Sequence, residues 1–147
     1  MKVEGTREFE APRDRVWAVI SDPESMSKLM PGVEGFEVVD DDHWKAKVKI
    51  PLGLGGLKMS IAFEKLDERP LEFSSMRAKG KGVGALMDMT TSFTLTGEGE
   101  HTTMAWQADV SIAGAVGSMG QRVLQPIINQ QVEQVLGALE RQVEAAK

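Results

Sequence analysis

The chain lacks cysteine and tyrosine altogether, and it has only two histidines among its 147 residues. Without a thiol it can form no disulfide, no thiolate zinc site and no iron–sulfur cluster, and it has no cysteine nucleophile. Two histidines are also too few for a three-histidine metal site. Composition alone therefore excludes several classes of metal and redox chemistry.

Long apolar runs are missing as well. No stretch approaches the ~18 consecutive apolar residues of a membrane-spanning helix, and the N-terminus carries charges at positions 2, 4, 7, 8 and 10, which predicts no signal peptide. The formal net charge of −5 argues against nucleic acid as a partner, because phosphate binding needs a basic surface. We expect a cytoplasmic protein, either soluble or peripheral at the inner face of the membrane.

What is present is typical of a folded chain, with 41% hydrophobic and 27% charged residues. No linker, repeat or low-complexity tract divides the sequence, so residues 1–147 are interpreted as a single domain. At this length a chain buries roughly two-thirds of its unfolded surface. It therefore needs neither a metal nor a disulfide to hold its core.

An opening strand over residues 1–10 is followed by two short predicted helices. Their apolar faces are Val16, Trp17 and Ile20 in the first helix, and Met26, Leu29 and Met30 in the second. Asp22 is an N-cap residue with Pro23 in the first turn, and the pair at 31–32, Pro-Gly, ends the second helix.

From residue 33 to 114 the apolar period changes to two, which is the period of strands. The predicted strands are 33–40, 44–50, 57–64, 71–80, 87–96 and 104–112, and the predicted turns are 40–42, 53–56, 68–70 and 97–100. With the opening strand they form a seven-stranded antiparallel meander with one dry face. Lys45, Lys47 and Lys49 alternate with apolar residues, which places them on the outer face.

The last third of the chain returns to a helical period. Leu124, Ile127, Ile128, Gln131, Val135, Ala138 and Leu139 form one apolar stripe. Because proline removes a helix hydrogen bond, we expect either a kink at Pro126 or a short segment from about Ala115 joined to the main helix.

This order of elements predicts an α+β helix-grip (START/Bet v 1-like) fold, in which a curved seven-stranded sheet wraps a long C-terminal helix. Two short helices follow the first strand. One long helix cannot cover seven strands completely. The predicted interior is therefore a hollow between the sheet and the last helix.

Several motifs also point to a family. In chain order they are Glu4-Gly5, Val16-Trp17, Asp22-Pro23, Met30-Pro31-Gly32, Val48-Lys49, Leu52-Gly53, the glycines Gly80, Gly82 and Gly84, Phe93-Thr94-Leu95, Thr102 with Trp106, and Gly114 with Met119-Gly120-Gln121-Arg122. With these motifs nearly the whole chain resembles the carbon monoxide dehydrogenase G-subunit family of the START/polyketide cyclase-like (SRPBCC) superfamily.

The resemblance implies an accessory protein of a carbon monoxide dehydrogenase-type molybdenum hydroxylase. It also implies docking of that enzyme at the membrane surface and a hydrophobic molecule, a quinone or a lipid, in the cavity. No covalent cofactor is expected. Some members carry a C-terminal extension proposed to contact the membrane, whereas this sequence ends at Lys147, which puts direct anchoring in doubt.

The candidate ligand-binding residues lie on the predicted dry face of the sheet and on the helix stripe. They are Met59, Ile61, Phe63, Phe73, Met87, Met89, Phe93, Met104, Trp106, Leu124, Ile128 and Gln131. The methionines carry the inference, because an unbranched, polarizable side chain suits an adaptable apolar surface. Ordinary core packing explains the same pattern equally well.

Gln131 is the polar exception within the helix stripe, where an unpaired amide would cost about 1–3 kcal/mol. Its partner is either a strand hydroxyl such as Thr91, a buried water, or an oxygen of a bound ligand. If Phe73 points inward, simple alternation predicts that Arg77 also points inward and that Asp88 points outward, unless a bulge changes the phase. Arg77 and Asp88 are interpreted either as structural or solvated charges, or as a polar contact to a ligand headgroup.

Acid–base candidates are scarce. His43 and His101 each follow acidic residues in a predicted turn, so both are interpreted as solvated. The glycine-rich turn at 53–56 is either a plain hairpin or an apolar lip at the cavity mouth.

Three functions remain open from the sequence. The first is a non-catalytic carrier or membrane-recruitment adaptor that holds a quinone or lipid. The alternative is a polyketide cyclase/dehydratase-like enzyme, which requires an interior acid or base. The third is a pure protein–protein adaptor, which requires an exposed apolar patch and no sizeable cavity.

Overall fold

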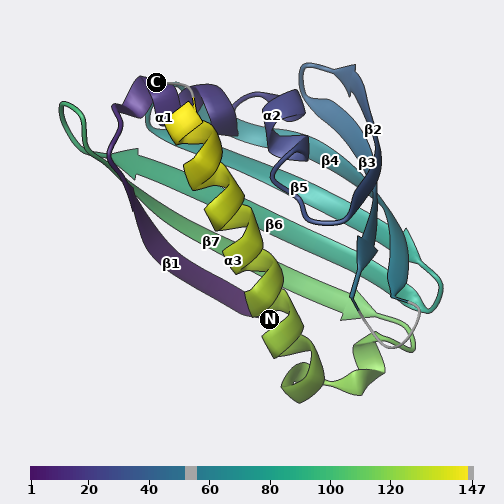
Figure 1. The fold of residues 1–147 in the computed structure, drawn as a ribbon. Helices are drawn as coiled ribbons and strands as arrows, with labels where there is room; N and C mark the ends of the chain where they lie inside the picture. Colours follow the sequence, from purple (N-terminus) through teal and green to yellow (C-terminus); the bar gives the residue numbers. More distant parts are fainter. Residues whose placement is uncertain (52–55, 146–147) are drawn as a thin grey trace.

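The computed structural model describes residues 1–51 and 56–145, which form an α+β fold with a seven-stranded sheet (Figure 1). The strands are β1 (Lys2–Phe9), β2 (Val33–Asp40), β3 (His43–Ile50), β4 (Leu57–Arg69), β5 (Phe73–Gly82), β6 (Ala85–Thr96) and β7 (Thr102–Ala113). The helices are α1 (Arg13–Ile20), α2 (Pro23–Ser27), the 3₁₀ turn η1 (Gly117–Met119) and α3 (Gln121–Ala145).

Neighbouring strands of the sheet are antiparallel throughout, in the order β1-β7-β6-β5-β4-β3-β2. The predicted meander therefore holds for β2 to β7, but β1 joins the far edge beside β7. α1 and α2 carry the chain from one edge of the sheet to the other, which separates β1 from β2 (Figure 1).

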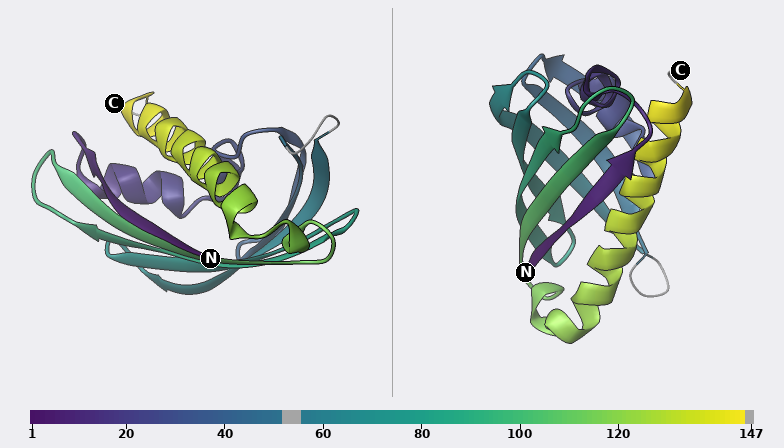
Figure 2. Two further views of the ribbon diagram at one scale, coloured as in Figure 1. Left: turned by 90° about the horizontal axis from the view of Figure 1, so that it is seen from below. Right: turned by 90° about the vertical axis from the view of Figure 1, so that its left-hand side faces the viewer.

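All three helices lie on the concave face of the sheet. Figure 2 shows the sheet curving around α3, with α1 and α2 beside it on the same face. Asp22 caps α2 as expected, since its carboxylate accepts hydrogen bonds from the backbone N–H groups of Glu24 and Ser25. The helix-grip architecture predicted from the sequence is confirmed.

The alternation on β3 is confirmed residue by residue. Trp44 and Val48 are buried on the concave face, while Lys45 and Lys47 are exposed on the other. Trp44 pairs with Phe63 of β4 in the ladder, and their rings stack with centroids 5.4 Å apart.

Alternation on β5 runs opposite to the prediction. Phe73 pairs with exposed Thr94, and Ser74 pairs with buried Phe93, so Phe73 lies on the convex face. The register of β5 against β6 sets this phase, while β4 carries one extra residue in a bulge between Lys65 and Glu68. The inward position predicted for Phe73 is therefore wrong, and its ring lies under the Arg69 guanidinium, 5.0 Å away.

Arg77 shares the convex face with Phe73, contrary to the inward direction predicted by simple alternation. Asp88 lies on that face as predicted, and its carboxylate accepts two hydrogen bonds from Arg77, at 3.1 and 2.6 Å. The hydrogen bond from Arg77 lowers the pKa of Asp88. The pair is structural and lies outside the space under α3.

The hydrophobic core is closed at one end of the sheet only. There α1 and the C-terminal half of α3 pack together, with Val16, Leu139 and Val143 almost fully buried. Met104 belongs to this closed region, with 0% of its surface exposed. In the N-terminal half of α3, Leu124 is buried, but Ile127, Ile128 and Val132 are only partly buried.

Polar contacts hold α3 over the sheet. Arg7 of the edge strand β1 donates to Glu140 at 2.6 Å, and its other terminal nitrogen lies 3.7 Å from Glu133. Pro126 lies inside α3, and η1 precedes the helix. A short segment therefore precedes the main helix as expected, but it ends at Met119 and leaves Pro126 inside α3.

Thr102 ties the closed end together. Its hydroxyl is fully buried and donates to the carbonyl of Ala11 at 2.7 Å, which joins β7 to the segment before α1. Thr102→Val should destabilise the fold by about 1–3 kcal/mol, because the buried carbonyl loses its partner. Urea denaturation measures the change. Thr103→Val is the matched control, since Thr103 makes an exposed bond, and an equal loss in both variants would contradict the argument.

The β2–β3 hairpin carries a pH-sensitive pair. Asp40 lies 2.8 Å from His43 Nδ1, and this hydrogen bond raises the pKa of His43 above its ordinary value of 6.5. The pair therefore stabilises the fold below pH 6.5, and its contribution is lost as the pH rises through the raised pKa.

Replacement of the carboxylate should reverse this shift. In Asp40→Asn the pKa of His43 should fall towards the ordinary histidine value, as followed by NMR titration of the imidazole protons. Asp41→Asn is the control, because Asp41 makes no contribution to the shift. An unchanged His43 titration in Asp40→Asn would show that the pair does not form in solution.

Candidate functional site

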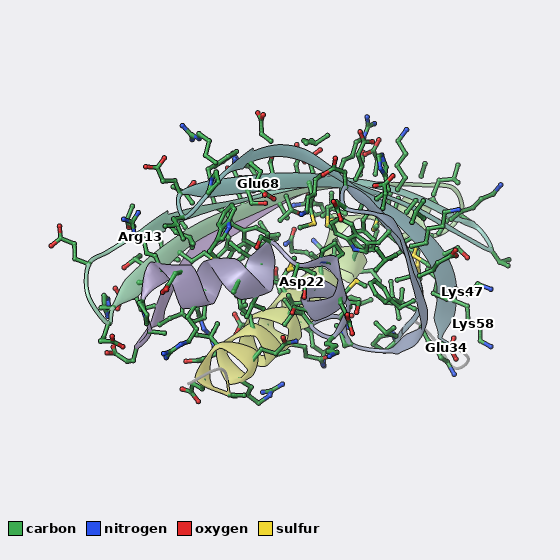
Figure 3. The ribbon with its side chains drawn as sticks, turned by 90° about the horizontal axis from the view of Figure 1, so that it is seen from above. Arg13, Asp22, Glu34, Lys47, Lys58 and Glu68 are labelled. Atoms are coloured by element: carbon green, nitrogen blue, oxygen red, sulfur yellow. The ribbon has the colours of Figure 1, made fainter. Side chains whose placement is uncertain are left out.

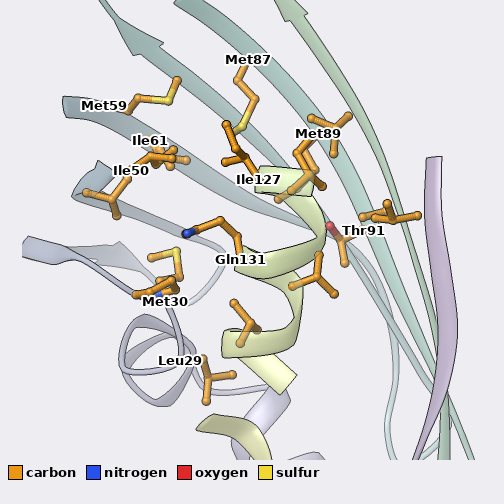
Figure 4. Close-up of a pocket in the computed structure, with 18 of the residues that line it drawn as sticks. Leu29, Met30, Ile50, Met59, Ile61, Met87, Met89, Thr91, Ile127 and Gln131 are labelled. Atoms are coloured by element: carbon orange, nitrogen blue, oxygen red, sulfur yellow. The ribbon is translucent and has the colours of Figure 1, made fainter. Parts of the chain in front are cut away.

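A cavity of about 270 Å³ lies between the concave face of the sheet and the N-terminal half of α3 (Figure 4). It is lined by Val3, Met26, Leu29, Met30, Pro31, Trp44, Val48, Ile50, Leu57, Met59, Ile61, Phe63, Met76, Ala85, Met87, Met89, Thr91, Phe93, Trp106, Ala108, Val110, Ile112, Val116, Leu124, Ile127, Ile128, Gln131, Val132, Val135 and Leu136. The hollow predicted from the helix-to-sheet mismatch is therefore present.

Most of the predicted site residues are brought together here. Those that line the cavity are Met59, Ile61, Phe63, Met87, Met89, Phe93, Trp106, Leu124, Ile128 and Gln131. Phe73 does not, because it lies on the convex face. Met104 does not either: it points inward but belongs to the closed end of the core. The alternation of apolar residues predicts which face of the sheet a residue lies on, but it does not predict whether that part of the face lines the cavity or the closed core.

Methionines supply much of the wall. Those that line it are Met26, Met30, Met59, Met76, Met87 and Met89. Met26 and Met30 were assigned only to a helix face, although their helical spacing beside Leu29 already indicated an apolar surface facing the sheet. Met76 was missed because the phase of β5 was reversed.

Glycine on β5 leaves room for these flexible side chains. Gly80 pairs with Ile61 on one side and Met87 on the other. A Cβ atom at Gly80 would lie 2.8 Å from the Met59 methyl carbon and 3.2 Å from that of Met87. The two methionine side chains thus converge over a position that has no side chain of its own.

Side chains with polar atoms are few in this lining. They are Trp44, Thr91, Trp106 and Gln131. Figure 4 shows Gln131 extending from α3 towards Ile50 and Ile61, while Thr91 lies on the other side of the helix. Of the partners considered for Gln131, Thr91 is therefore excluded, because the two side chains lie on different sides of α3 and Thr91 Oγ1 has no partner. The Thr91 hydroxyl is buried and has no hydrogen-bond partner.

No charged side chain belongs to the lining formed by residues 1–51 and 56–145. His43 and His101 are in hairpins at the surface, half exposed, as predicted. Figure 3 shows Lys47 and Lys58 extending outward from the sheet. The electrostatic environment of the cavity is thus neutral.

Neither a metal centre nor a bilayer-crossing helix is found in the part of the chain that the structure describes. No group of three or more acidic or histidine side chains lies close enough there to hold a metal ion. No helix in the same residues is long and apolar enough to cross a membrane. The turn residues 52–55, which carry the proposed apolar lip, lie outside the described residues.

Solved structures with this fold are numerous. A conserved protein from Geobacillus kaustophilus superimposes with a TM-score of 0.91 at 20% identity, covering 99% of this chain and 97% of that one. A START superfamily protein from Mycobacterium smegmatis gives 0.77 at 16% identity, with 99% of both chains covered. The Zhui aromatase/cyclase from Streptomyces sp. R1128 gives 0.73 at 17%, covering 98% and 93%. At these identities the likeness shows the fold alone.

Sequence comparison is more specific. No curated protein sequence matches the chain significantly. The family model that describes the carbon monoxide dehydrogenase G-subunit (CoxG) matches residues 5–144, which include every strand except the first residues of β1 and nearly all of α3. The chain therefore belongs to the CoxG family.

Proposed function

We propose that the protein is a non-catalytic carrier that holds an uncharged hydrophobic molecule, a quinone or a lipid, between the sheet and α3. The observation that carries this proposal is the lining of the cavity, which is apolar apart from the neutral polar atoms of four side chains. Ligand sites in proteins combine a mostly apolar wall with a few polar groups in the same way. An ionised ligand would lose its hydration there without gaining a counter-charge.

The size of the cavity limits the ligand. Its volume of about 270 Å³ lies near the lower end of typical ligand pockets, which span roughly 300–1,000 Å³. This suits one ring system better than a complete long-chain lipid. The partly exposed Met30, Ile50 and Ile127 would then contact a tail that continues towards the opening beside α3.

Membership of the CoxG family suggests the partner, because the family takes its description from carbon monoxide dehydrogenase. We infer that the chain serves a carbon monoxide dehydrogenase-type molybdenum hydroxylase, by exchanging the hydrophobic ligand with it or by recruiting it to the membrane. Cytoplasmic placement at the inner face of the membrane is part of this proposal.

An enzyme of the polyketide cyclase/dehydratase kind is the alternative from the sequence, and a neighbour of the same fold is an aromatase/cyclase. Such chemistry needs an interior acid or base. The cavity lining within residues 1–51 and 56–145 offers neither a carboxylate, an amine nor an imidazole. No specific observation therefore favours the enzymatic function over the carrier.

Native mass spectrometry of the protein purified from its own host tests the carrier function. We expect a non-covalent adduct that organic solvent extracts as a quinone or a neutral lipid. Added 2-methyl-1,4-naphthoquinone should quench tryptophan fluorescence, because Trp44 and Trp106 line the cavity. An empty protein that shows no quenching would exclude the proposal.

A cavity-filling variant locates the binding site. In Gly80→Val the new side chain should push the methyl ends of Met59 and Met87 into the cavity and weaken naphthoquinone binding by roughly tenfold or more. Gly35→Val on β2 is the matched control, since a Cβ there meets nothing within 4 Å. Fluorescence titration of both variants measures the difference, and equal affinities would place the ligand elsewhere.

One end of the molecule is suited to a membrane surface. We call it the basic apolar end, and it consists of Val83, Leu86, Met119 and Val123 with Lys58, Lys81 and Arg122. Val83 is 93% exposed at the tip of the β5–β6 hairpin. The Val116 N–H donates to the Gly84 carbonyl, which ties the segment before α3 to this hairpin. Apolar tips among basic side chains fit an anionic bilayer.

Sedimentation with vesicles tests this surface. Wild type should bind phosphatidylglycerol vesicles more strongly than phosphatidylcholine vesicles. Val83→Glu should reduce binding to phosphatidylglycerol several-fold, because it removes an apolar contact and adds a negative charge that the anionic lipid repels. Val39→Glu is the control, since Val39 is also exposed, at 53%, but lies beside Asp40 at the other end of the sheet. Equal binding by both variants would exclude the basic apolar end as the contact.

A further inference from the structure

Gln131 carries the polar group of the cavity wall that a ligand can reach. Trp44 is almost completely buried, and Thr91 Oγ1 and Trp106 Nε1 have almost no accessible surface of their own. Gln131 also lines the cavity but stays partly exposed. Within the described lining, its amide is therefore the neutral polar group that is open to a bound molecule.

The position of Gln131 on α3 aims its side chain into the cavity. Residues three and four positions apart along a helix lie on the same face. Ile127, Ile128 and Val135 are in this relation to Gln131, and all three line the cavity. Figure 4 shows the side chain extending away from α3, with its amide on the side of Ile50. The amide thus lies between the helix and the strands opposite.

The protein itself offers this amide no partner within residues 1–51 and 56–145. Other amides of α3 pair with each other, Gln121 with Gln125 and Gln125 with Asn129, but Gln131 takes part in no such hydrogen bond. Opposite it, β3 and β4 each have a neighbouring strand on both sides, so their backbone groups are engaged in the ladders. A covered amide needs a partner, because it gives up its hydrogen bonds to water. A bound molecule would supply one.

The chemistry of an amide specifies that partner. Its NH2 group is a donor and its carbonyl oxygen is an acceptor. With no cation in the described lining, an ionised carboxylate or phosphate would be buried there without a counter-charge. A neutral oxygen remains. A quinone offers a carbonyl that accepts from the NH2 group, and the reduced quinol offers at the same place a hydroxyl that donates to the amide oxygen.

The location of the amide also agrees with the path proposed for a tail. In a quinone that carries its tail on the carbon next to a carbonyl, the tail and that carbonyl leave the ring at the same edge. Met30 and Ile50, which would contact the tail, lie on the same side of the cavity as the Gln131 amide in Figure 4. This arrangement allows one edge of the ring to face Gln131 while the tail continues past Met30 and Ile50.

We propose that the Gln131 amide is the polar contact for a quinone in both of its redox states. Its NH2 group donates a hydrogen bond to a carbonyl oxygen of the quinone, and its carbonyl oxygen accepts one from a hydroxyl of the quinol. This rests on the proposed function, because it requires that the cavity holds a ligand, and it narrows the ligand to a quinone. A carrier with this contact retains its ligand before and after reduction.

Calorimetric titration of one variant tests the contact. Gln131→Met keeps the length of the side chain but removes the amide donor and acceptor. It should weaken the binding of 2-methyl-1,4-naphthoquinone about 3- to 10-fold, the ratio expected for one net hydrogen bond. Binding of 2-methylnaphthalene, which has no oxygen, should not weaken. Gln134→Met is the matched control, because Gln134 is exposed on the same helix and does not line the cavity.

Reduction of the probe tests the second role of the amide. Under anaerobic conditions Gln131→Met should weaken the binding of 2-methyl-1,4-naphthohydroquinone by a similar factor, because the hydroxyl loses its acceptor. A loss for the quinone without a loss for the quinol would overturn the proposal that one amide serves both redox states.

Infrared spectroscopy gives a readout that packing alone would not change. A hydrogen bond weakens the C=O bond of its acceptor, so the carbonyl band of bound naphthoquinone should lie at lower frequency in wild type than in Gln131→Met. The band should be the same in Gln134→Met as in wild type. Equal frequencies in wild type and Gln131→Met would show that the amide does not reach the carbonyl.

The outcomes separate this inference from the proposed function. If neither naphthoquinone nor 2-methylnaphthalene binds to wild type, the proposed function fails and this inference with it. If Gln131→Met binds naphthoquinone as tightly as wild type, or loses both probes equally, the cavity function stands and the contact is overturned. If the variant loses affinity for methyl palmitate but not for naphthoquinone, the amide binds an ester lipid and the quinone assignment is overturned.

Discussion

One helix has to cover the concave face of a seven-stranded sheet, and the rest of the structure follows from that mismatch. α1 and α2 relieve it at one end, where they fill the space between α3 and the strands and close the core around Val16 and Leu139. At the other end only α3 and the residues Met26, Leu29 and Met30 face the curved sheet, and the cavity remains between them. The fold therefore combines a closed core and a cavity, both of which are covered by the same helix.

Much of this could be predicted from the sequence, because the spacing of apolar residues and the positions of turn and capping residues indicate whether a segment is a strand or a helix. The alternation of apolar and charged residues on β3 correctly predicted which side chains are buried and which are exposed, and Asp22 with Pro23 correctly predicted the start of α2. The errors arose where tertiary register decides. The phase of β5 depends on its pairing with β6, so Phe73 was placed on the wrong face. Met104 was given the right face but the wrong end of the sheet, a distinction that no periodicity contains.

The polar groups show a second kind of limit. The lysines of β3 were correctly assigned to the outer face, because their alternation with apolar residues was clear, whereas Arg77 was assigned inward together with Phe73. The partner of Gln131 could not be deduced, since a helix stripe spans an arc wide enough for its members to face opposite walls of a cavity (Figure 4). Thr91 was noticed only as that partner. Its orphaned hydroxyl emerged from the packing of β6 under α3.

The pairing of β1 with β7 has a consequence for how the chain folds. Lys2 pairs with Asp109, so the first strand finds its partner only after almost the entire sheet has been made. During synthesis on the ribosome, β1 would remain unpaired until β7 has been synthesised, because β7 is the strand with which it pairs. Contacts this distant in sequence carry a large loop-closure cost and slow folding. α3 follows β7 in the chain, so it can cover the concave face only after β1 and β7 have both been synthesised.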